Sequence, residues 1–136
     1  MKGQYTTIQY VLFFAIGIVL VMFVYNIFSN VGNIYKDQIT RVELQKTGEL
    51  IRTNIVSVYE VANRTNSFIE YTFGIPKEIS DCVYSIEVRS YLMLNCTNSN
   101  INAQLSLYNI NVRPKIIYSS KGTIKIASYP YEVDLE

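Results

Sequence analysis

The longest apolar pattern in the chain runs from Ile8 to Phe28 and contains no charged residue. A helix rises about 1.5 Å per residue, so about 20 apolar residues are enough to cross the hydrocarbon of a bilayer. A helix also satisfies its own backbone polar groups, which lipid requires. We therefore expect Gln4–Phe28 to form a hydrophobic helix that resides in lipid or in an equally apolar helix bundle.

After Phe28 the pattern becomes amphipathic, with apolar residues at helical steps of three and four. This stripe consists of Tyr35, Ile39, Val42, Leu50 or Ile51, Ile55, Val58 and Ala62. The spacing predicts that residues 29–66 continue the first helix, so that one helix runs from about Tyr5 to about Thr65. Gly32 and Gly48 each weaken it by about 1 kcal/mol relative to alanine, and no proline precedes Pro76.

Around Pro76 the apolar period changes from helical spacing to two, which is typical of strands with one buried face. A loop at Val88–Ser90 would place Cys82 opposite Cys96, and it would bring further apolar pairs onto the same face. These pairs are Tyr84 with Leu94 and Ile86 with Leu92. The pattern therefore predicts a hairpin that begins an antiparallel β domain over residues 67–136.

A second hairpin is predicted at Ser120–Gly122, where glycine can adopt a left-handed conformation. It would set Tyr118 opposite Ile124 and Ile116 opposite Ile126. Further strands are expected within 103–112, with Leu105 and Leu107 on one face, and within 131–135. The expected fold class is α+β: a long N-terminal hydrophobic and amphipathic helix packed on a small antiparallel β-sheet or β-sandwich of five or six strands.

Composition narrows the functions that this fold can serve. The chain of 136 residues has 12 basic and 11 acidic side chains, so it lacks the basic surplus that nucleic-acid binding needs. It contains no histidine, which removes the usual general base and the commonest metal ligand. Two cysteines alone do not make a zinc site, and the glycines form no phosphate-binding loop. We predict no catalytic residue, metal or cofactor.

Cys82 and Cys96 admit two interpretations. In a domain outside the cell they would form a cross-strand disulfide. Alternatively, they are two buried thiols that fill small positions in the core. We favour the disulfide, whose loop of about 15 residues would stabilise the domain by about 3 kcal/mol.

Two triplets match the acceptor pattern for N-linked sugars, Asn63-Arg64-Thr65 and Asn95-Cys96-Thr97. Asn95 is expected on the strand face opposite to Cys96, and Asn63 near the end of the helix. Both are candidate glycosylation sites if the domain lies outside the cell.

The N-terminus resembles the class III signal of archaeal type IV pilin-like proteins. The resemblance lies in Lys2-Gly3-Gln4, with a hydroxyl at Thr6 and an unbroken apolar helix directly after it. It implies that residues 1–3 are a leader and that a membrane prepilin peptidase cuts between Gly3 and Gln4. Many such pilins have glutamate at the fifth position of the mature chain, whereas this sequence has Ile8. The segment from Gly74 to Ile86 is loosely similar to the entry into the first strand of these proteins.

The resemblance implies a structural subunit, either major or minor, of an archaeal surface filament. Its partners would be copies of itself or related pilins, and it would reside in the cell membrane before assembly and in the extracellular filament afterwards. The β domain would contact neighbours, other cells or solid supports. The alternative is an uncleaved single-pass anchor that holds a β domain outside the membrane, as in stator-like components of the archaeal swimming filament.

Overall fold

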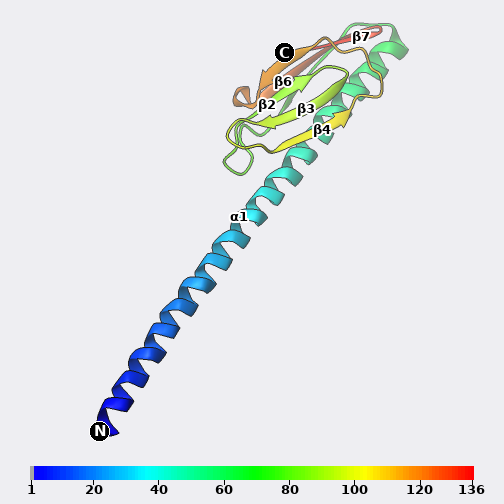
Figure 1. Cartoon of the computed structure of the whole chain (residues 1–136). Coiled ribbons are helices and arrows are strands. Elements are labelled where there is room, and N and C mark those ends of the chain that lie inside the picture. Colours follow the sequence, from blue (N-terminus) through cyan, green and yellow to red (C-terminus); the bar gives the residue numbers. More distant parts are fainter. Residues whose placement is uncertain (1) are drawn as a thin grey trace. The chain divides into compact units, whose positions relative to one another are not determined.

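The computed structural model describes the backbone of residues 2–136 and the side chains from residue 8 onward. A single helix, α1 (Lys2–Thr65), is followed by seven strands (Figure 1). The chain divides into two units, one up to Lys36 and one covering Asp37–Glu136. The first unit is helical, and the second contains the rest of α1 and all strands. This α+β architecture confirms the predicted fold class and the predicted continuous helix.

The helix ends because the chain turns left-handed directly after Thr65. Asn66 has φ 48°, a conformation that asparagine tolerates better than most residues. The backbone N–H of Ser67 then donates to Ala62 O at 3.2 Å, and the Thr65 hydroxyl donates to Val61 O at 2.8 Å. These bonds satisfy carbonyls that the last turn of a helix leaves free.

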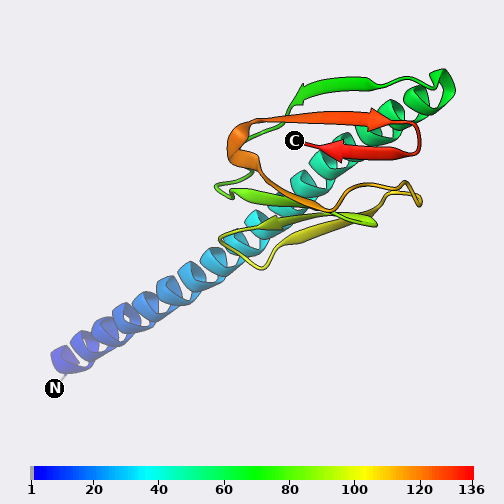
Figure 2. The same ribbon diagram turned by 90° about the horizontal axis from the view of Figure 1, so that it is seen from above.

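The strands form two sheets that lie against the second half of α1 (Figure 2). The first sheet has the order β1-β6-β7, with β1 (Ile69–Gly74), β6 (Thr123–Tyr129) and β7 (Glu132–Leu135). The second has the order β4-β3-β2-β5, with β2 (Tyr84–Val88), β3 (Tyr91–Cys96), β4 (Asn102–Ser106) and β5 (Lys115–Tyr118). All strand pairs are antiparallel. The count of seven exceeds the expected five or six because β1, which the sequence pattern did not predict, pairs with β6.

One hydrophobic core joins the helix to both sheets. The helix contributes Leu44, Ile51, Ile55 and Val58, and the sheets contribute alternate residues of their inner faces. Those inner faces include Tyr84, Ile86, Val88, Leu92, Leu94, Ala103, Leu105, Ile117, Ile124, Ile126, Val133 and Leu135. Each such side chain removed from water stabilises the fold by roughly 1.5–3 kcal/mol.

The helix stripe was predicted correctly in its second half and wrongly in its first. Ile51, Ile55, Val58 and Ala62 are buried, but Tyr35, Ile39, Val42 and Leu50 are about half exposed or more. The buried face continues toward the N-terminus through Thr40, Leu44 and Thr47 instead. Threonine is short enough to lie under the sheets. A prediction based only on large apolar residues therefore selects the wrong face of the helix in this part of the chain.

Gly48 lies at the closest approach of helix and sheet. A Cβ atom on this residue would meet Leu94 Cδ1 at 3.2 Å and would lie still closer to Leu105 Cδ1. The absence of a side chain therefore lets two leucines of β3 and β4 pack directly on the helix backbone. A Cβ atom on Gly32 or Gly17, by contrast, would meet no described atom within 4 Å beyond the adjacent backbone of the helix itself.

The first predicted hairpin is present, but its register differs by two residues. Tyr84 pairs with Cys96, Ile86 with Leu94 and Val88 with Leu92, and the loop between the strands consists of Arg89 and Ser90. Cys82 lies before β2 and is not opposite Cys96. A shift of two keeps every side chain on its predicted face, so hydrophobic alternation alone did not distinguish the two registers.

The second predicted hairpin was wrong. β5 pairs with β2, setting Ile117 opposite Ile86, whereas β6 pairs with β1 and β7. The turn between them is a short 3₁₀ helix, η1 (Ser119–Lys121), followed by Gly122 at φ 73°, and it carries the chain from one sheet to the other. Ile117 is buried, while Ile116 and Tyr118 are more than half exposed, so the face of β5 is opposite to the predicted one.

The two remaining strand predictions were right in position, although the first strand is shorter than expected. β4 ends at Ser106, and Leu105 and Leu107 are buried on one side as predicted. Tyr108 and Asn109 then adopt positive φ values of 53° and 61°, which stop the strand. β7 covers Glu132–Leu135 and pairs with β6 around Pro130 and Tyr131.

Candidate assembly and anchoring surface

The most unusual surface of the described chain is the N-terminal part of α1. Its large apolar side chains from Ile8 to Tyr35 are exposed by 42% to 74%, on every side of the helix. The helix is long and apolar enough to cross a membrane by length and composition, starting at Ile8. Soluble proteins rarely expose apolar patches larger than a few hundred Å², so this surface requires lipid or other protein around it.

The distribution of charged residues agrees with the extent of this apolar surface. No charged residue occurs between Gly3 and Tyr35, and Lys36 is the first to follow. Polar side chains within the stretch are amides and hydroxyls, and Asn26 Nδ2 donates to Met22 O at 2.8 Å within its own helix. Such a bond lowers the cost of placing an amide in apolar surroundings.

The predicted processing site lies at the start of this helix. The backbone of Gly3 and Gln4 is helical, and the side chains of residues up to Thr7 lie outside the described part of the structure. Cleavage between Gly3 and Gln4 therefore stays a prediction.

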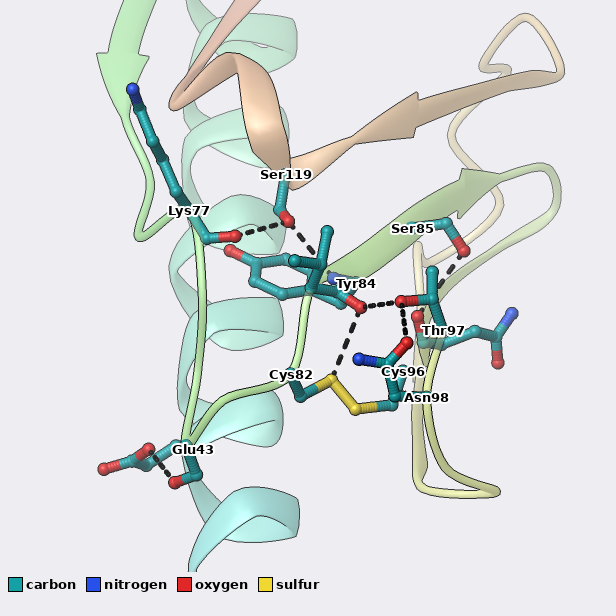
Figure 3. The surroundings of a disulfide bond; sticks show 12 residues. Glu43, Lys77, Cys82, Tyr84, Ser85, Cys96, Thr97, Asn98 and Ser119 are labelled. Carbon is teal, nitrogen blue, oxygen red and sulfur yellow. Dashed lines mark hydrogen bonds between the residues drawn. A yellow bond between two sulfur atoms is a disulfide. The ribbon is translucent and has the colours of Figure 1, made fainter.

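A disulfide joins Cys82 to Cys96 in the β domain, with Cα atoms 5.8 Å apart (Figure 3). Both residues are less than 10% exposed. Cys82 is held before β2 by reciprocal backbone hydrogen bonds of 2.9 Å with Ile79, and Cys96 ends β3. Of the two interpretations of these cysteines, the bridged one holds, and it is typical of proteins outside the reducing cytoplasm.

Tyr84 and Ser119 connect three segments next to this disulfide (Figure 3). The Tyr84 hydroxyl donates to Pro76 O at 2.6 Å, and the Tyr84 backbone N–H donates to Ser119 Oγ at 3.1 Å. Ser119 Oγ in turn donates to Lys77 O at 2.7 Å. Both side chains are fully buried, and burial raises the pKa of Tyr84 from 10.0 to about 12. The network fixes the point where the chain passes between the sheets.

The two candidate glycosylation sites differ in accessibility. Asn63 is exposed in the last turns of α1. Asn95 is half-buried within β3, paired with Ser85 on one side and Asn102 on the other. The Thr97 hydroxyl of that second triplet donates to Val83 O at 2.7 Å. The opposite orientation of Asn95 and Cys96 agrees with the predicted alternation, whereas modification of either asparagine stays a prediction.

Charged side chains on the first sheet form ion pairs, one of them with Arg113 of the segment between β4 and β5. Arg113 contacts Glu132 through two hydrogen bonds of 2.9 Å, and Lys125 contacts Glu70 at 2.9 Å. The Arg113 guanidinium holds the pKa of Glu132 below its ordinary value, while Glu132 raises the pKa of Arg113. Within the described part of the chain, no three His, Cys, Asp or Glu side chains are grouped as a metal ion would require.

Two features of the helix were missed in the sequence pattern although their spacing was visible. One is the buried face of Thr40, Leu44 and Thr47, which repeats at four and three residues. The other is a row of asparagines at Asn26, Asn30 and Asn33, with the same steps of four and three. In both cases a search for apolar residues alone overlooked polar residues on a helical face.

The fold and these surfaces define an α+β protein with a membrane-spanning type of helix and a disulfide-bonded β domain, an arrangement compatible with a membrane-anchored extracellular protein. The order of elements, a long N-terminal apolar helix followed by an antiparallel β domain, is the order that the resemblance to pilin-like proteins implies. No known protein family, curated protein or solved structure matches the chain.

Proposed function

We propose that this protein is a structural subunit of an archaeal type IV pilus-like surface filament, assembled through its N-terminal hydrophobic helix. The observation that supports it best is the apolar surface of Ile8–Phe28, which is exposed on all sides of the helix. A lone membrane anchor uses such a surface only for its contact with lipid. A subunit that moves from the membrane into a bundle of like helices needs it in both places.

Processing would come first. A prepilin peptidase would cut between Gly3 and Gln4 on the cytoplasmic side, and the mature chain would begin at Gln4. Loss of Lys2 would leave 11 basic and 11 acidic side chains. The trimmed helix would then leave the bilayer and pack among other copies.

Burial of the helix in such a bundle keeps its apolar area out of water. Each Å² of that area contributes about 25 cal/mol relative to exposure in water. The gain relative to lipid is smaller, so packing contacts between helices must supply the preference for the filament. Contacts between subunits that do not close into a ring generate an open helical filament.

The β domains would form the outer surface. The Cys82–Cys96 bridge suits a domain that must persist outside the cell. We further propose that this surface contacts neighbouring subunits, other cells or solid supports, that its role is structural and not catalytic, and that it requires no cofactor.

The second candidate function is an uncleaved anchor that holds the β domain at the cell surface, as in a stator-like component of the archaeal swimming filament. The specific observation in its favour is Ile8, which stands where many pilins have glutamate. That glutamate is associated with subunit addition, and its absence also fits a minor pilin.

N-terminal sequencing and intact mass of protein from its native membrane separate these two functions. Filament assembly predicts a chain that starts at Gln4 and recovery in sheared surface filaments. The variant Gly3→Val is expected to retain its first three residues and stay in the membrane, whereas Gly17→Val, at an unobstructed position of the same helix, should still be cleaved. A wild-type chain that keeps Met1 and is absent from filaments would contradict the proposal.

A further inference from the structure

Three asparagines form a row on the N-terminal unit of α1, at Asn26, Asn30 and Asn33. Steps of four and three place them on one face of the helix. All three are exposed. Ile27 and Ile34 beside them are 46% and 58% exposed, Ser29 adds a hydroxyl to the same face, and Lys36 follows Asn33 one turn later. The row is therefore a narrow band of amides at the end of the hydrophobic surface.

The location of this band indicates what covers it. Ile8–Phe28 already supplies the length that hydrocarbon requires, so most of the band lies beyond the lipid core. A helix segment that faces water normally carries charge on its outer side. Residues 29–35 carry none, and Val31 and Tyr35 are 42% and 63% exposed. This segment therefore has the composition of a surface covered by protein.

An amide is its own complement, because it has a carbonyl acceptor and an NH₂ donor. A second copy of the chain in the same membrane brings the same band at the same depth. Amide side chains that meet between helices in apolar surroundings hydrogen-bond across the interface. A single buried asparagine is enough to fix the register of a coiled coil, at some cost in stability. Leucine at the same positions would give more apolar contact but no preferred register.

We propose that Asn26, Asn30 and Asn33 form interhelical amide hydrogen bonds with a second copy of this chain and set how the helices align in the assembly. This inference rests on the proposed function, since it requires self-association through α1. It adds a specific polar contact where the hydrophobic surface alone would allow helices to slide past one another.

The test measures self-association of the full-length chain in non-ionic detergent by sedimentation equilibrium. One variant replaces all three asparagines by alanine and another replaces them by leucine, which has the same branched shape without the polar atoms. One interhelical hydrogen bond changes a dissociation constant by about threefold, so three lost together should raise it by roughly 20- to 30-fold. Both variants are expected to show this loss, and circular dichroism checks that each retains its helix.

Asn54→Ala is the matched control, because Asn54 Nδ2 donates to Leu50 O at 3.0 Å in the same way that Asn26 bonds to Met22. It should leave association unchanged. The inference is overturned if the leucine variant associates as tightly as the wild type or more tightly, or if the alanine variant is unaffected. A wild-type chain that stays monomeric at all concentrations contradicts the proposed function itself, which separates the two failures.

Discussion

Replacing Tyr84 by phenylalanine tests the link between β2 and the segment that precedes it. The ring is fully buried, and its hydroxyl donates to Pro76 O at 2.6 Å. Phenylalanine keeps the ring and removes only this bond. An unpaired buried carbonyl costs about 1–3 kcal/mol, but Pro76 is an exposed residue, so water can take the place of the hydroxyl. We expect a loss of about 1 kcal/mol at neutral pH, toward the lower end of that range.

The pH dependence gives the same substitution a second, independent signature. The pKa of Tyr84 is about 12 in the folded protein, raised by burial from 10.0. The unfolded chain therefore loses this proton first, and stability that is present below pH 10 is lost as the pH rises toward 12. Each pKa unit corresponds to about 1.4 kcal/mol, so the total loss approaches about 3 kcal/mol. Tyr84→Phe lacks this loss, and it should become the more stable protein above about pH 11.

Urea unfolding of the full chain in detergent, followed by far-ultraviolet circular dichroism at several pH values, measures both effects. Tyr118→Phe is the control, because Tyr118 is 57% exposed on the neighbouring β5, and it should change stability by less than about 0.5 kcal/mol. A difference between wild type and Tyr84→Phe that stays constant from pH 7 to pH 12 would refute the claim that burial sets the pKa of Tyr84.

Three further predictions concern the packing and surface of the β domain. Gly48→Val should destabilise it by about 2 kcal/mol, because the new side chain would press against Leu94 and Leu105. Gly32→Ala, at an open position of the same helix, should gain up to about 1 kcal/mol of helix stability. Thermal unfolding measures both changes. Joint replacement of Cys82 and Cys96 by serine should cost about 3 kcal/mol in urea unfolding, and reducing agent should then no longer alter the stability. Mass spectrometry of native protein should find sugar on Asn63 and none on Asn95, because Asn63 is exposed and Asn95 is paired inside β3; sugar on Asn95 alone would contradict this.

Local periodicity predicted the helix and every strand except β1, but among the strand pairs it predicted only β2 with β3 correctly. The helix, its end near Thr65 and the inward faces of β2, β3 and β4 follow from spacing within a few residues. The pairing of β5 with β2, and of β6 with β1, depends on contacts between distant segments. Two strands with similar alternation that are separated by a glycine turn fit the pattern of a hairpin as well as they fit two different sheets. The buried hydrogen bonds of Ser119 with Tyr84 and Lys77 hold the turn at which the chain crosses between the sheets.

The hydrophobic helix and the disulfide could be predicted from the sequence, but the buried face of the amphipathic part of the helix could be predicted only in part. A long uncharged stretch identifies the hydrophobic helix without any structure. The disulfide was the favoured of two interpretations of Cys82 and Cys96, which were expected to face each other on adjacent strands, although the predicted register was wrong by two residues. The exposed first half of the stripe, at Ile39 and Val42, was missed because threonine can occupy a buried helical position as well as an aliphatic residue does.

The shared core has a practical meaning for anyone who wants the β domain in water. Leu44, Ile51, Ile55 and Val58 belong to the same core as the strand residues, so a fragment that begins after Thr65 would lack the helical part of that core. A useful truncation must be cut inside α1, near Asp37, where the second unit begins. The chain has no linker between its hydrophobic segment and its folded β domain, because one helix is part of both.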